Sequence, residues 1–149
     1  MIAQTEHGFI CANAGVDRSN VPEGQAVLLP TDADRSAHHI RVNLERATGA
    51  SIAVVVTDTF GRPWRRGLVD VAIGVSGLPA ILDLRGSPDT HDRTMHVTEI
   101  AIVDEIAAAA DLAMGKADAI PVAVVRGLDL TGDGRATDLV RPPEEDLFR

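Results

Sequence analysis

An amphipathic helix that leads directly into an apolar, β-branched strand is the feature that most constrains this 149-residue chain. The helix is predicted over Asp34–Thr48, where apolar residues recur every three or four positions, and it ends at Gly49. Ser51–Val56 follows almost at once as a nearly continuous apolar run, which is typical of a strand buried on both faces. A helix and a buried strand in such close succession predict a mixed α/β domain.

The rest of the chain extends this pattern. A second helix is predicted over Thr98–Met114, and the other strand candidates are Gly8–Ala12, Gln25–Leu29, Val69–Val75 and Ile120–Val125. No internal repeat, low-complexity tract or linker divides the sequence, so residues 1–149 are interpreted as one domain. The predicted fold is a mixed, α+β-like β-sheet core packed by two main helices.

Charge and cysteine content narrow the functional classes. The net charge of −8 disfavours a broad nucleic-acid-binding surface. The longest apolar stretches are too short to span a membrane, and the first residues do not resemble a signal peptide, so we expect a cytoplasmic protein. With Cys11 as the only cysteine, an intrachain disulfide and a zinc–thiolate cluster are both excluded.

Oxygen-bearing side chains gather in a short loop after the first strand candidate. Asp17, Ser19 and Asn20 follow Gly15, which permits a tight turn. Hard cations such as Mg²⁺ bind through one or two carboxylates together with phosphate oxygens and water. The alternative is an Asx or ST turn in which these side chains bond to their own backbone, and for this loop alone that alternative is favoured.

A second group of polar residues follows the strand Ser51–Val56. Asp58 and Thr59 offer a charged oxygen and a hydroxyl at a strand end, where many α/β proteins bind ligands. Arg62 and Arg65 provide planar donors suited to phosphate or carboxylate, and we hypothesise that they hold substrate anions. The alternative, of equal weight, is a capped turn with a solvated arginine surface. Taken together, two aspartates after two strands suit a metal–nucleotide site.

Long ordered motifs carry a resemblance to a known family. The sequence is similar to the coenzyme F420:L-glutamate ligases over nearly its whole length, in Gly8–Asn20, Asp58–Arg65, Val69–Val75, Asp104–Ala110, Met114–Asp118 and Pro121–Gly127. The resemblance implies a GTP-dependent ligase that attaches L-glutamate to the deazaflavin precursor F420-0. In such a reaction the acceptor's lactyl carboxylate is phosphorylated, the glutamate amine attacks the acyl phosphate, and further glutamates join through γ-linkages.

The resemblance also assigns roles to individual residues. It implies that Asp17 and Asp58 are metal ligands, that Thr59 binds a second metal, and that Asn20 contacts GTP. The implied cofactors are Mg²⁺ or Mn²⁺ at two sites, with a monovalent cation such as K⁺ beside them. Lys116 lies in a stretch that resembles the family's nucleotide-contacting region, but its ammonium cannot supply the metal-binding oxygen that some members offer there.

The resemblance leaves open whether this polypeptide works as a ligase by itself. The family has an N-terminal segment before the Ala-Gly-Val-Asp motif and a final helical segment, so we expect this chain to be a truncated core of a larger ligase fold. The resemblance also implies an intertwined homodimer. Two alternatives to a working ligase remain: a metal-dependent phosphohydrolase that uses the same two aspartates, and an inactive fragment that only folds and associates.

Overall fold

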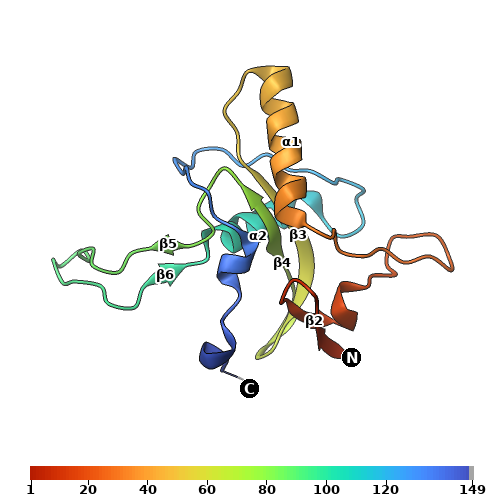
Figure 1. Cartoon of the computed structure of the whole chain (residues 1–149), viewed down its shortest axis with the longest axis horizontal. Helices are drawn as coiled ribbons and strands as arrows, with labels where there is room; N and C mark the ends of the chain where they lie inside the picture. The colour runs from red at the N-terminus through yellow and green to blue at the C-terminus, as the bar shows by residue number, and fades with distance from the viewer. Residues whose placement is uncertain (148–149) are drawn as a thin grey trace.

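The computed structural model describes residues 1–147 and is organised around one long antiparallel hairpin (Figure 1). Strand β3 (Val54–Arg62) pairs with β4 (Arg65–Ser76), from Val54 opposite Ser76 to Arg62 opposite Arg65. The pairing shifts at two places, between Val56 and Thr57 and between Gly61 and Arg62. The mixed α/β class predicted from the sequence is confirmed, with the strands in small antiparallel sheets.

Two shorter sheets flank this hairpin. Strand β1 (Ile2–Gln4) pairs with β2 (Ile10–Ala12), and β5 (Leu82–Asp83) pairs with β6 (Glu99–Ile100). The segment between β5 and β6 continues as an arm that projects away from the rest of the molecule (Figure 1). Within residues 1–147 each sheet therefore has two strands, and the single sheet core expected from the sequence is replaced by one dominant hairpin.

Both predicted helices are present. Helix α1 (Ala33–Thr48) begins where the Asp32 side chain accepts the N–H of Arg35 at 2.8 Å, and it ends at Gly49 with φ of 70°. Helix α2 (Ile102–Met114) begins later than expected, because Glu99 and Ile100 belong to β6. Three short 3₁₀ turns complete the described helices, at Asn13–Gly15, Ala136–Leu139 and Pro143–Glu145.

The core forms where the two helices meet the hairpin. Val75 belongs to a buried cluster that includes Val103 of α2. Its neighbour Gly74 faces the other way, and a Cβ there would collide with the carbonyl of Ala33 at the start of α1. Successive strand residues point to opposite faces, so α1 and α2 contact β4 from different sides. The small side chain at position 74 lets α1 approach closely.

Three strand predictions need correction. Ile120–Val125 forms no strand: Pro121 lacks an N–H, no described segment pairs with it, and Val122 and Val124 are 70% and 75% exposed. Gln25–Leu29 forms only an isolated bridge, between Val27 and Asp17. The strand expected at Ser51–Val56 begins at Val54, continues to Arg62 and is half-buried, because antiparallel hairpins can leave one face uncovered.

None of the helices in residues 1–147 has the length and apolar character needed to cross a bilayer.

Candidate metal–nucleotide site

The middle of β3 carries two of the predicted ligands. Asp58 lies opposite Val71 and Thr59 opposite Asp70, so both belong to the strand itself and not to a loop after it. The expected location at a strand end is therefore wrong, since an antiparallel hairpin continues past Asp58 instead of ending there. Neighbouring residues alternate between faces, which gives Asp58 and Thr59 different directions from one strand.

Asp70 is a functional candidate that the sequence argument did not select. It is only 6% exposed, and its carboxylate accepts hydrogen bonds from two hydroxyls of the facing strand. Thr59 Oγ1 donates to Oδ1 at 2.8 Å, and Thr57 Oγ1 donates to Oδ2 at 2.9 Å. A buried charge needs such partners, and these bonds fix the Thr59 hydroxyl. The available signal was a charged residue inside the apolar run Val69–Val75.

The carboxylate of Asp58 lies in an environment that disfavours its charge. Burial raises its pKa, and the nearby Asp17 and Asp70 carboxylates raise it further. The N–H of Thr59, which donates to Asp58 Oδ1 at 2.8 Å, and the charge of Lys116 act in the opposite direction. A cation bound between Asp17 and Asp58 would stabilise the charge of Asp58, which burial and the neighbouring carboxylates disfavour.

Asp17 belongs to a turn that holds its carboxylate in place. Ser19 donates its backbone N–H to Oδ1 at 2.8 Å and its hydroxyl to Oδ2 at 2.7 Å. These bonds are the main cause of the lowered pKa of Asp17, and Lys116 adds a smaller contribution. The local turn that the sequence left open is therefore present. It presents an ionised Asp17 beside Asp58.

Lys116 is the point at which the predicted residues converge. Its carbonyl accepts the Asn20 side-chain amide at 3.1 Å, and its Nζ lies 3.5 Å from Thr59 Oγ1. Its charge also acts on both Asp17 and Asp58. Asn20 has the left-handed φ of 52°, which asparagine tolerates better than most residues. The tertiary structure thus brings five residues together from three separate segments of the chain: Asp17, Asn20, Asp58, Thr59 and Lys116.

The donor set fits one divalent cation better than two. Asp17 and Asp58 supply the two carboxylates that Mg²⁺ commonly uses, the rest being phosphate and water. Among residues 1–147, no group of three or more His, Cys, Asp or Glu side chains is placed to hold a metal ion. Thr59, expected at a second metal, already donates to Asp70 and faces the ammonium of Lys116.

The two arginines proposed for substrate anions lie at the tip of the β3–β4 hairpin. Arg62 donates from its guanidinium to the carbonyl of Arg66 at 2.6 Å, which folds its side chain back over the turn. Arg65, its pairing partner, is exposed, and its side chain makes no hydrogen bond or ion pair with residues 1–147. Along β3, Arg62 lies four residues beyond Asp58, which corresponds to about 13 Å of strand. Whether the arginines contact a substrate stays a prediction.

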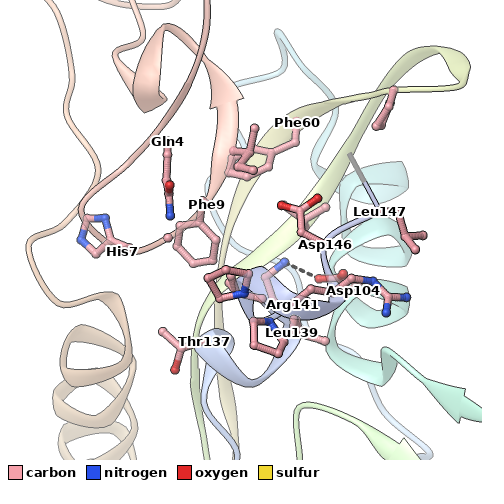
Figure 2. A pocket seen from close by; sticks show the side chains of 18 residues that line it. Gln4, His7, Phe9, Phe60, Asp104, Thr137, Leu139, Arg141, Asp146 and Leu147 are labelled. Atoms are coloured by element: carbon pink, nitrogen blue, oxygen red, sulfur yellow. Dashed lines mark hydrogen bonds between the residues drawn. The ribbon is translucent and has the colours of Figure 1, made fainter. Parts of the chain in front are cut away.

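A cavity of about 600 Å³ is lined by Phe60, which lies two residues after Asp58 on β3 (Figure 2). Phe9 and Phe60 line it as an edge-to-face pair with ring centroids 6.1 Å apart. Val71, the pairing partner of Asp58, also lines it, so the cavity opens on the strand face that carries Asp58. Phe60 and Asp58 are two residues, or about 7 Å, apart along β3.

Polar groups in this cavity come from distant parts of the chain. Asp104 of α2 accepts the N–H of Ala72 at 2.9 Å, and burial raises the pKa of its carboxyl group. Arg141 lies on the C-terminal segment, is exposed, and makes no hydrogen bond or ion pair with residues 1–147. No local sequence pattern indicates this cavity, because its walls are brought together only by the fold. Its size and mixed lining are those of a small-molecule site.

Comparison with known proteins identifies the group to which these features belong. The family model for F420-0:gamma-glutamyl ligase matches residues 1–127. Proteins named coenzyme F420:L-glutamate ligase are 47% identical in Methanocaldococcus jannaschii, 48% in Methanothermobacter thermautotrophicus and 43% in Methanopyrus kandleri. Each match covers 100% of this chain and 60%, 61% and 62% of the respective relative, so the chain spans about three fifths of their length.

Proposed function

The chain belongs to the F420-0:gamma-glutamyl ligase family, and from that premise we propose that it joins L-glutamate to F420-0 with GTP as co-substrate. The observation that carries the proposal is the convergence of Asp17, Asn20, Asp58, Thr59 and Lys116 around one carboxylate pair. All five residues belong to the motifs that carry the family resemblance, in Gly8–Asn20, Asp58–Arg65 and Met114–Asp118. A structural turn alone would not require segments so far apart in sequence to meet.

The proposed reaction has two balanced steps. An oxygen of the acceptor carboxylate takes the terminal phosphoryl group of GTP, which breaks the bond to GDP and forms an acyl phosphate. The glutamate amine then attacks the carbonyl carbon, phosphate leaves with the electron pair of the C–O bond, and the amine loses a proton. Later additions would use the γ-carboxylate of the glutamate already attached. Positioning and charge stabilisation supply most of the catalysis in phosphoryl transfer.

Asp17 and Asp58 are the residues that would hold a divalent cation, Mg²⁺ or Mn²⁺. When bound, the ion neutralises charge on the transferred phosphoryl group. The Ser19 bonds hold Asp17 in place and lower its pKa, while a bound cation would stabilise the charge of Asp58, which burial disfavours. The Asn20 amide is oriented by its bond to the Lys116 carbonyl, which leaves its own oxygen for the nucleotide. A monovalent cation such as K⁺ remains an expectation of the family resemblance.

The cavity behind Phe60 is the proposed place for the acceptor's aromatic ring. Two phenylalanines offer apolar and edge contacts to a planar heteroaromatic group. Arg141 at the same cavity offers a guanidinium with no partner in residues 1–147 to an acceptor anion. Since the cavity shares its strand face with Asp58, a bound acceptor can direct its carboxylate toward the metal–nucleotide site. Arg62 and Arg65 would hold further substrate anions at the hairpin tip.

A homodimer is also part of the proposal. Apolar side chains are exposed along 120–125, where Val122 and Val124 are 70% and 75% accessible. Burial of such side chains against a second copy would stabilise association. Light scattering at several protein concentrations tests this point, and a monomer at every concentration would contradict it.

The decisive experiment measures phosphate release and product mass in parallel. Purified protein is incubated with GTP, Mg²⁺ or Mn²⁺, F420-0 and L-glutamate, each omitted in turn. A ligase gives glutamylated product and a phosphate release that depends on both acceptor and glutamate. Phosphate release that depends on neither F420-0 nor L-glutamate supports a phosphohydrolase. A folded protein that neither binds nucleotide nor shows turnover supports an inactive fragment.

The matched variants are Asp58→Asn and Asp92→Asn. Both remove one negative charge with little change of shape, but Asp92 lies on the arm between β5 and β6, away from the β3–β4 hairpin (Figure 1). Its left-handed φ of 59° also suits asparagine. We expect Asp58→Asn to lose activity and Asp92→Asn to retain it. An equal loss of activity in both variants would overturn the assignment of Asp58 to the active site.

A further inference from the structure

We propose that the ammonium group of Lys116 serves as the second positive charge of this site, so that the chain works with one divalent cation instead of two. The inference rests on the proposed function and specifies how the site is charged. Its geometric basis is the 3.5 Å separation between Nζ and Thr59 Oγ1, between residues fifty-seven positions apart.

The position of Lys116 is fixed by its main chain as well as by its side chain. Its carbonyl accepts the amide of Asn20, which belongs to the same loop as Asp17. Gly115 before it ends α2 with a φ of 65°, where any side chain would be strained and would meet Asp118. The backbone at the end of α2 therefore directs this lysine toward the strand that carries Asp58 and Thr59.

A second divalent ion does not fit beside Thr59 in the observed arrangement. The Thr59 hydroxyl donates its proton to Asp70, so only its oxygen lone pairs face outward. Mg²⁺ bound to that oxygen at about 2.1 Å would come within about 5.6 Å of Nζ at most. Like charges this close repel each other, and both oxygens of the nearby Asp70 carboxylate already accept hydrogen bonds, from Thr57 and Thr59.

An ordinary surface lysine would not produce this arrangement. Lys116 is the only lysine in a chain whose other basic side chains are arginine and histidine. Lysine is a compact point charge on a flexible stem, and its charge reaches both carboxylates of the pair at once. Arg would instead bring a planar fork with a preference for paired oxygens. The compact ammonium group of Lys116 can therefore take the place of a small cation at this position.

The test counts bound Mn²⁺ by electron paramagnetic resonance, with and without saturating GDP, in the wild-type chain and two variants. Lys116→Gln removes the charge and adds a carbonyl oxygen, whereas Lys116→Met removes the charge and adds no ligand. We expect one tightly bound Mn²⁺ per wild-type chain and one in Lys116→Met. In Lys116→Gln we expect a second ion at least tenfold tighter than any second ion in the wild type.

The outcomes separate this inference from the proposed function. Two Mn²⁺ ions of similar affinity in the wild type would overturn the role of Lys116 and leave the ligase assignment standing. No bound Mn²⁺ in a folded wild-type chain would overturn the metal–nucleotide site itself, and the inference with it. Because Lys116 is exposed, the variants are expected to fold, which circular dichroism checks directly. The wild-type count decides the question even if a variant does not fold.

Discussion

The carboxylate of Asp34 in the first turn of α1 accepts the backbone N–H of Val75 in β4 at 2.8 Å, although forty-one positions separate them. The same oxygen, Oδ1, accepts the N–H of Ala136 at 3.1 Å. One side chain thus joins a helix, the central hairpin and the 3₁₀ turn near the C-terminal end. The bond also satisfies a β4 N–H that lies beside the core.

Replacement of Asp34 tests how much this junction contributes to stability. Asp34→Ala removes the acceptor of two partly buried N–H groups, so we expect a loss of about 2–5 kcal/mol in the free energy of unfolding. Urea denaturation followed by circular dichroism measures it. Asp34→Asn keeps an oxygen in place and should lose clearly less. Similar losses in both variants would show that charge, and not the hydrogen bonds, is responsible.

Gly74 and Gly61 form a matched pair for the packing of α1. An added methyl group at Gly74 would collide with the carbonyl and Cβ of Ala33, whereas nothing lies within 4 Å at Gly61. We expect Gly74→Ala to destabilise the protein by about 1–3 kcal/mol through overpacking, and Gly61→Ala to have little effect. Thermal unfolding compares them. A stable Gly74→Ala variant would contradict the close contact between α1 and β4.

The pH dependence of Asp58→Asn follows from the raised pKa of the carboxyl group. Between the unfolded pKa near 3.8 and the higher folded pKa, the native state binds more protons, so the contribution of Asp58 to stability falls as pH rises. In metal-free buffer, the variant should therefore gain stability relative to wild type above this range. Its Oδ1 can still accept the Thr59 N–H. Thermal melts at pH 4 and pH 7 reveal the change.

Added Mn²⁺ should make the wild-type protein more stable than Asp58→Asn. An ion present at a hundredfold excess over its dissociation constant stabilises the wild-type native state by about 2.7 kcal/mol, and it should not stabilise Asp58→Asn comparably. The same melts with Mn²⁺ measure this. A variant that is less stable than wild type without metal, or that gains equally with metal, would contradict the carboxylate-pair interpretation.

The acceptor cavity is tested by Arg141→Ala. Loss of a charge-assisted contact to an acceptor anion should weaken F420-0 binding roughly tenfold, as measured by the fluorescence of the bound chromophore. Mn²⁺ and GDP binding should remain unchanged, because Arg141 lies at the cavity and not at the carboxylate pair. Arg46→Ala is the control, since Arg46 is an exposed arginine in the last turn of α1. Equal effects of both variants would place the acceptor elsewhere.

Local sequence signals determined the helices and the chemistry of the site. Asp32 and Gly49 delimit α1 because capping bonds and a left-handed glycine act within a few residues. The aspartates were recognisable because few residue types offer a hard oxygen ligand. The turn around Asp17 is likewise local, and Ser19 two residues away completes it.

Pairing was decided only by the tertiary structure. Ile120–Val125 has the composition of a strand, yet a strand exists only where another backbone accepts and donates its hydrogen bonds, and residues 1–147 offer none there. For the same reason Asp58 lies within a strand, since β4 continues opposite it as far as Arg65.

Long-range convergence was also beyond the reach of local patterns. Asp70 gains significance from two hydroxyls on the facing strand, and Lys116 from Thr59, fifty-seven positions away. Charge interactions depend on distance in space, which the spacing of residues along a chain does not record. The sequence by itself therefore determined which side chains offer oxygen ligands, and the fold decided which of them lie close enough to hold the proposed cation.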